Sequence, residues 1–142
     1  MEKLSIDAVF ILSVRTFEDR INHVKQQMAL HDLSYQFIFE FDIPVLRSEV
    51  LINTFETEDV LDKPQQSLVL KHIHAWRLCV EKNYKNILVF EDDVILKENF
   101  VTRLNDAVTN LEHKQNAYLL FLGGADTKVP DAFLLSNDAI VE

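Results

Sequence analysis

Apolar segments alternate along the chain with segments in which apolar residues recur at helical spacing. The segment IDAVFILSV is almost entirely apolar and rich in branched residues, which indicates a strand buried on both faces. In SYQFIFEFD, aromatic residues alternate with polar or smaller ones, which indicates a second strand. On these and similar patterns we predict strands over residues 6–14, 34–42, 86–90, 117–124 and 131–142.

Three segments have the periodicity of amphipathic helices, and we place them at residues 16–31, 65–84 and 98–113. Thr16 and Asp19 have the spacing of a capping box at the start of the first helix. The predicted apolar faces are Phe17, Ile21, Val24 and Met28; Val69, Ile73, Trp76 and Val80; and Phe100, Leu104, Val108 and Leu111. Residues 43–63 show weaker signals, and we expect irregular chain there with at most a short helix or strand near residues 47–53.

Strands that alternate with helices predict an α/β fold, here a three-layer sandwich with a mostly parallel sheet in a single domain over residues 1–142. In such sheets, ligands bind beyond the carboxyl ends of the strands. The strand-to-helix turns of this chain are therefore where we look for functional residues.

Composition excludes several classes of function. The net charge of −9 argues against binding to nucleic acid or to an anionic membrane surface, because both reward clusters of Lys and Arg. The two glycines are adjacent, so the chain has no glycine-rich phosphate-binding loop. A single cysteine excludes an internal disulfide and fits a reducing, cytoplasmic setting, and no apolar run is long enough to predict a transmembrane segment.

The most informative motif is the triplet Glu91, Asp92 and Asp93, which directly follows the strand at 86–90. On extended chain, Glu91 and Asp93 point to one side and Asp92 to the other. Carboxylates at the carboxyl edge of a sheet suit Mg²⁺ or Mn²⁺, with substrate phosphates completing the coordination. An acidic turn without a ligand is an equally good interpretation of the triplet alone.

Two further groups are candidates. Ser13, Arg15 and Arg20 surround the first strand-to-helix turn, where a nucleotide is usually contacted in doubly wound sheets. For Arg20, an internal ion pair is at least as good an interpretation. His72 lies on the predicted apolar face one turn before Trp76, as a core residue would, but its helix should approach the same edge as the acidic triplet.

In this order, the segments ILSVRTFEDR, HIHAW, ILVFEDDVIL, LLFLGG and DAFLLS resemble glycosyltransferase family 25, the lipopolysaccharide/lipooligosaccharide glycosyltransferases. The resemblance implies a GT-A-like (Rossmann-like) nucleotide-sugar-binding fold. Residues 91–94 take the place of the metal-binding Asp-x-Asp motif of such enzymes. Two departures stand out: Lys71 replaces a serine of the family pattern, and SLVL stands where a Gly-Cys pair is common.

The resemblance further implies a metal-dependent, inverting transfer of a hexose from a nucleotide-sugar donor, expected to be a UDP-sugar, to a glycan acceptor such as lipopolysaccharide. It also allows peripheral association with a membrane through that acceptor. Glu91 and Asp93 would bind Mn²⁺ or Mg²⁺, and the donor-binding residues would be Ser13, Arg15, Arg20, His72 and Asp92. It assigns no catalytic base. Family members continue past the end of this sequence, so we expect an incomplete transferase.

Two alternatives remain. The first is a catalytically degenerate domain of the same fold that binds a nucleotide sugar or has a regulatory role. The second is a metal-dependent phosphoryl-transfer or phosphoacceptor domain built on the acidic triplet. That class also needs an acid at the end of the first strand, and LSVR offers none there.

Overall fold

In a computed structural model, the chain is an α/β protein, described here for residues 3–55, 61–114 and 118–123. These residues form two compact units, one within residues 6–98 and one that joins residues 3–5 to the chain from Asn99 on. The elements of the first unit are β1 (Ala8–Leu12), α1 (Glu18–Leu30), β2 (Gln36–Ile38), the 3-10 helix η1 (Ile43–Val45), α2 (Ser48–Thr54), α3 (Lys63–Glu81) and β3 (Ile87–Glu91). The second unit contains α4 (Phe100–Lys114).

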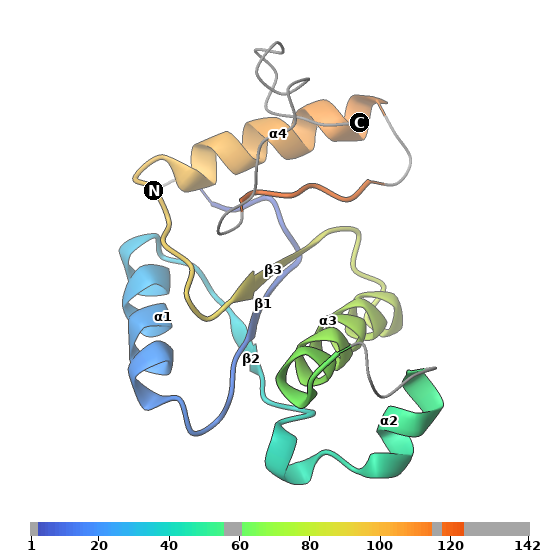
Figure 1. Ribbon diagram of the computed structural model, residues 1–142. Helices are drawn as coiled ribbons and strands as arrows, with labels where there is room; N and C mark the ends of the chain where they lie inside the picture. The colour runs from blue at the N-terminus through green and yellow to red at the C-terminus, as the bar shows by residue number, and fades with distance from the viewer. Residues whose placement is uncertain (1–2, 56–60, 115–117, 124–142) are drawn as a thin grey trace, which may run out of the picture. The chain divides into compact units, whose positions relative to one another are not determined.

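The sheet of the first unit is parallel, with the strand order β2-β1-β3 (Figure 1). Leu12 is paired with Ile38 on one side and with Glu91 on the other, so the three strands end at a common edge. From β1 the chain continues to β2 on one side of it, and then crosses to β3 on the other side of β1. This reversal makes the carboxyl ends of β1 and β3 a topological switch point, the usual ligand position in open α/β sheets.

Helices α1 and α3 lie on opposite sides of the sheet (Figure 1). On one side, Phe10, Leu12 and Ile38 pack with Ala75 of α3 in a buried apolar cluster. The intervening β1 residues point to the other side, where Val24 and Met28 of α1 are fully buried. Burial of both faces explains why β1 is continuously apolar, as the sequence predicts.

Local signals set the limits of the helices. Asp62 and Gln65 form the capping box of α3, in which each side chain accepts a hydrogen bond from the other's backbone N–H. The capping box predicted for α1 is wrong: Phe17 is the N-cap and no side chain caps the helix. The amide of Phe17 donates to the carbonyl of Val14, so Thr16 lies inside a tight turn and not at the cap position.

The predicted apolar face of α3 is also wrong. Trp76 and Val80 are 52% and 80% exposed, whereas Lys71, which is not part of the predicted apolar face, is 2% exposed. The buried residues of α3 are Gln66, Ser67, Leu70, Lys71 and Ala75. The helix is therefore rotated relative to the face that side-chain polarity alone predicts, because Lys71 finds polar partners under the helix.

In the second unit, Asn105 of α4 accepts a hydrogen bond from the amide of Ser5 at 2.8 Å and donates one to the carbonyl of Lys3 at 3.0 Å. Leu104, Val108 and Leu111 are buried, as predicted for this helix. Residues 118–123 lie in no strand, which contradicts the prediction for 117–124: an apolar run forms a strand only where a neighbour pairs with it. The predicted strand at 131–142 lies outside the described residues. None of the helices in the described part of the chain is long and apolar enough to span a membrane.

Cys79 is half-buried on α3, and its thiol donates to the carbonyl of Tyr84. Burial, and then the charge of Asp7, raise the pKa of Cys79 above its ordinary value of 9.0. We expect the folded chain to react with a thiol reagent at pH 8 roughly tenfold or more slowly than the urea-unfolded chain. Since the unfolded state loses this proton first, the contribution of the thiol to stability should fall as the pH rises above 9.0. Equal reaction rates in the two states would contradict this prediction.

Candidate functional site at the carboxyl edge of the sheet

Asp92 joins the end of β3 to the first strand-to-helix turn. It is 5% exposed, and its two carboxylate oxygens accept hydrogen bonds from Ser13 Oγ at 2.7 Å and from Arg20 Nη1 at 2.8 Å. The hydrogen bond from Arg20 to Asp92, and then the charge of Asp92, raise the pKa of Arg20. The structure thus brings together three of the predicted donor-binding residues, and it places Arg20 in the internal ion pair that the sequence left open.

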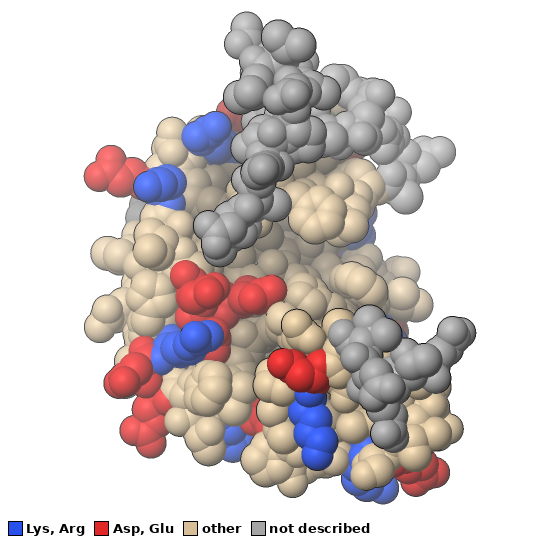
Figure 2. Space-filling model, in the orientation of Figure 1, with Lys and Arg blue, Asp and Glu red and all other residues tan. Residues whose placement is uncertain are grey.

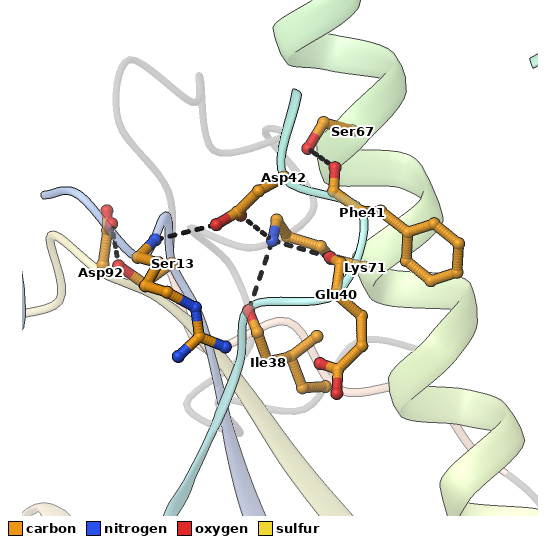
Figure 3. A network of polar contacts seen from close by, with 9 residues as sticks. Ser13, Ile38, Glu40, Phe41, Asp42, Ser67, Lys71 and Asp92 are labelled. Carbon is orange, nitrogen blue, oxygen red and sulfur yellow. Dashed lines mark hydrogen bonds and ion pairs between the residues drawn. The ribbon is translucent and has the colours of Figure 1, made fainter. Parts of the chain in front are cut away.

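Asp42 makes a second connection to the same turn. Its Oδ2 accepts from the backbone amide of Arg15 at 2.9 Å, and its Oδ1 accepts from Lys71 Nζ at 2.6 Å (Figure 3). The Arg15 side chain is exposed, and its guanidinium lies 4.6 Å from the centre of the Phe39 ring. The backbone of Arg15 is therefore fixed while its charge remains accessible to an anion.

One face of α1 holds the segment that follows the acidic triplet. His23 Nε2 lies 2.8 Å from the carbonyl of Val94, and Gln27 Oε1 accepts from the amide of Leu96 at 2.9 Å. Together with Arg20, these residues form a polar row at spacings of three and four along the helix. This row attaches residues 92–96 to α1, so the acidic triplet is not at the start of a loosely held loop.

Glu91 and Asp93 are exposed, whereas Asp92 between them is buried, which confirms the alternation predicted for the triplet. His72 Nε2 lies 3.9 Å from Glu91 Oε1, and the His72 ring is 6.1 Å from that of Trp76. The early part of α3 therefore reaches the acidic edge, as expected. In Figure 2, acidic side chains gather where β3 ends in Figure 1, with a basic group beside them.

The described residues do not form a metal-binding cage by themselves. Within residues 3–55, 61–114 and 118–123, no group of three or more His, Cys, Asp or Glu side chains is placed to hold a metal ion. Both oxygens of Asp92 already accept protein hydrogen bonds, which leaves Glu91 and Asp93 as the exposed carboxylates of the triplet. Two carboxylates fit a cation that takes its other ligands from water and substrate phosphates.

Four residues of this region were not predicted to be site residues: His23, Gln27, Asp42 and Lys71, although Lys71 stood out as a departure from the family pattern. The regular spacing of Arg20, His23 and Gln27 beside the apolar face of α1 was a signal that could have identified His23 and Gln27. Asp42 ends the second predicted strand, so the same edge rule that selected Asp92 could have selected it. Nothing in the sequence signals that Lys71 is buried, because its partner lies 29 residues away.

The first unit is thus an α/β domain with a three-stranded parallel sheet, which is consistent with a Rossmann-like fold, and polar side chains converge on its switch point between β1 and β3. A family comparison identifies which such domain this is. The chain belongs to glycosyltransferase family 25 (LPS biosynthesis protein), whose family model matches residues 6–132 and confirms the resemblance seen in the motifs.

Individual relatives share 25–34% of their residues with the aligned part of this chain. A stretch of 55 residues, 39% of the chain and 18% of the relative, is 34% identical to the lipooligosaccharide biosynthesis protein lex-1 of Haemophilus influenzae. A putative glycosyltransferase of the same species is 25% identical over 79% of the chain and 43% of its own length. The inactive glycosyltransferase 25 family member 3 of Homo sapiens is 25% identical over 85% of the chain and 22% of its own length. The chain thus spans less than half of these curated relatives.

Proposed function

We propose that this chain is the nucleotide-sugar-binding part of a glycosyltransferase with a GT-A-like, three-layer fold. The donor is a UDP-hexose, and the acceptor is a sugar of lipopolysaccharide or a related glycan. Membership of family 25 supports the reaction class, and a relative named for lipooligosaccharide biosynthesis supports the acceptor class. The observation that carries the proposal is the Ser13–Asp92–Arg20 network, which joins the two turns that flank the switch point.

In this proposal the turn after β1 binds the donor diphosphate. Arg15 supplies an exposed guanidinium held above the Phe39 ring, and guanidinium groups pair well with phosphate oxygens. Ser13 and Arg20 hold Asp92, and thereby fix the direction in which the rest of the triplet leaves the sheet. His72 is close enough to Glu91 to orient that carboxylate.

Glu91 and Asp93 would hold Mn²⁺ or Mg²⁺ in this scheme. A divalent cation at that position supplies charge stabilisation to a departing diphosphate. The chain would contribute the two exposed carboxylates that bind the cation, and the cation would in turn bind the diphosphate. None of the described residues is assigned as the base that deprotonates the acceptor hydroxyl.

A second candidate is a degenerate domain that binds the nucleotide sugar without transferring it. Three relatives of this chain are named as inactive or probably inactive family members, and each alignment covers 85% or more of the chain. Both candidates require the same nucleotide site. They differ only in whether the bound donor is consumed.

The test is calorimetric titration of the chain with UDP, with and without Mn²⁺, followed by incubation with UDP-hexoses and glycan acceptors. We expect metal-dependent UDP binding that Arg15→Ala weakens by about tenfold, as for loss of one charge-assisted contact. Arg47→Ala removes an exposed arginine from the start of α2 and is the matched control, with no expected effect on UDP binding. Absence of UDP binding would contradict both candidates, whereas binding without transfer or donor hydrolysis would favour the degenerate one.

A further inference from the structure

Lys71 is a buried cation whose ammonium group has three oxygen partners. Its side chain is 3% exposed. Nζ lies 2.6 Å from Asp42 Oδ1, 2.8 Å from the carbonyl oxygen of Glu40 and 3.4 Å from that of Ile38 (Figure 3). A lysine ammonium has three protons to donate, so this site uses its full capacity. Burial of a charge in this way is costly unless the partners are held in place.

Asp42 connects Lys71 to the first strand-to-helix turn. Its side chain is 10% exposed, and its second oxygen accepts the backbone N–H of Arg15 at 2.9 Å. Both oxygens of Asp42 are therefore engaged within the protein. This arrangement makes Asp42 a connector between α3 and β1, and it leaves the carboxylate poorly placed to act as a ligand or a base itself.

The backbone next to Asp42 is strained, which shows that the connection is maintained at a cost. Phe41 has a φ of 66°, in the left-handed region that a bulky aromatic residue rarely adopts. The Phe41 carbonyl accepts a hydrogen bond from Ser67 Oγ of α3 at 2.7 Å. Strained residues of this kind persist where their surroundings over-determine them, and they gather at functional sites.

We propose that Lys71 is a positioning residue of the nucleotide site. It holds Asp42 in the orientation that fixes the Arg15 amide, and through that amide it sets where the Arg15 guanidinium meets a diphosphate. The proposal rests on the proposed function for its ligand, although the coupling from Lys71 to Arg15 exists without one.

The experiment compares Lys71→Met with Leu70→Ala. Leu70 is a buried α3 neighbour, 5% exposed, and its truncation weakens the packing of the helix without removing a group that contacts Asp42. The first measurement is the amide proton shift of Arg15 in a ¹⁵N-labelled, ligand-free chain. We expect Lys71→Met to move this resonance upfield as the hydrogen bond to Asp42 loosens, and Leu70→Ala to leave it in place.

The second measurement is UDP affinity in the presence of Mn²⁺, at a temperature where both variants are folded. We expect Lys71→Met to weaken binding roughly tenfold, as for loss of one hydrogen bond to a charged group. For Leu70→Ala we expect a change within about twofold, because it has no partner in common with the site. Equal losses in the two variants would overturn the positioning role, as would an unchanged Arg15 resonance in Lys71→Met.

A second variant keeps the test decisive if Lys71→Met fails to fold. The pair Lys71→Met and Asp42→Asn removes both buried charges together, a change that proteins often tolerate, and retains an acceptor for Arg15. The reference for this pair is Asp42→Asn alone, which gives Arg15 the same neutral acceptor but keeps Lys71. We expect the Arg15 amide to lie further upfield in the pair than in Asp42→Asn, and the same shift in both would overturn the proposal. If the unmodified chain does not bind UDP, the proposed function fails, while the Arg15 resonance still decides whether Lys71 fixes the turn.

Discussion

Replacement of both Glu91 and Asp93 with alanine is expected to abolish the metal-dependent part of UDP binding. In the proposed site these carboxylates are the protein ligands of the cation among the described residues, and two carboxylates plus substrate phosphates are a usual set for Mg²⁺. Without them, we expect titrations with and without Mn²⁺ to give the same weak affinity, at least about a hundredfold below that of the unmodified chain with metal, because both direct ligands are lost. Calorimetric titration with UDP measures this difference directly.

The fold should survive this change, since both side chains are exposed. A control with the same loss of charge is Glu49→Ala with Glu81→Ala, two exposed acidic residues on α2 and α3. We expect the control to keep its Mn²⁺ response, which would exclude a general effect of net charge. A Mn²⁺ response that persists in the Glu91/Asp93 variant would refute the metal site, even if UDP still binds.

Replacement of Asp92 with alanine is expected to lower the stability of the chain markedly. It removes the acceptor of the buried Ser13 hydroxyl and the partner of Arg20 in one step. An unsatisfied buried polar group costs about 1–3 kcal/mol, so we expect a loss of about 2–3 kcal/mol in the free energy of unfolding. UDP binding should also fall, because the two turns are no longer tied together.

Urea unfolding followed by circular dichroism measures the stability loss, provided that the transition is two-state. Asp93→Ala is the matched control: it lies one position further along but is exposed, so its stability should stay within about 0.5 kcal/mol of the unmodified chain. Asp92→Asn keeps an acceptor for Ser13 and should fall between the two. If Asp92→Ala is as stable as Asp93→Ala, the network contributes nothing to the fold.

The sequence predicts the order of the elements in the first unit well, because the spacing of apolar residues and the local composition depend only on neighbouring positions in the chain. Strands at residues 6–14, 34–42 and 86–90 and helices at 16–31 and 65–84 all correspond to observed elements within a few residues at each end. The face of α3 could not be predicted in this way. A helical wheel places Lys71 outward by its polarity, whereas its position depends on Asp42 and on carbonyl groups that only the folded sheet brings near.

The candidate site was predictable to the extent that topology decides it. Ser13 and Asp92 each follow a strand of one parallel sheet, so topology alone places both at the common edge where the strands end, and in the structure the two side chains are in contact. The contacts of each carboxylate were not predictable. Asp92 accepts hydrogen bonds from Ser13 and Arg20 inside the protein, whereas Glu91 and Asp93 are exposed. Whether these two exposed carboxylates bind a metal, and whether the exposed Arg15 binds a donor, stay predictions.

The tie between β1 and β3 also bears on how the domain acquires its site during folding. The Ser13–Asp92 and Arg20–Asp92 contacts close loops of 79 and 72 residues. Non-local contacts of this length form late, after local helices, because the entropy of loop closure must be offset first. A partly folded chain with β1, α1 and β2 in place but β3 undocked would have an ordered hydrophobic layer and no site. In this domain, the ability to bind the ligand would therefore appear only after β3 has docked onto the sheet.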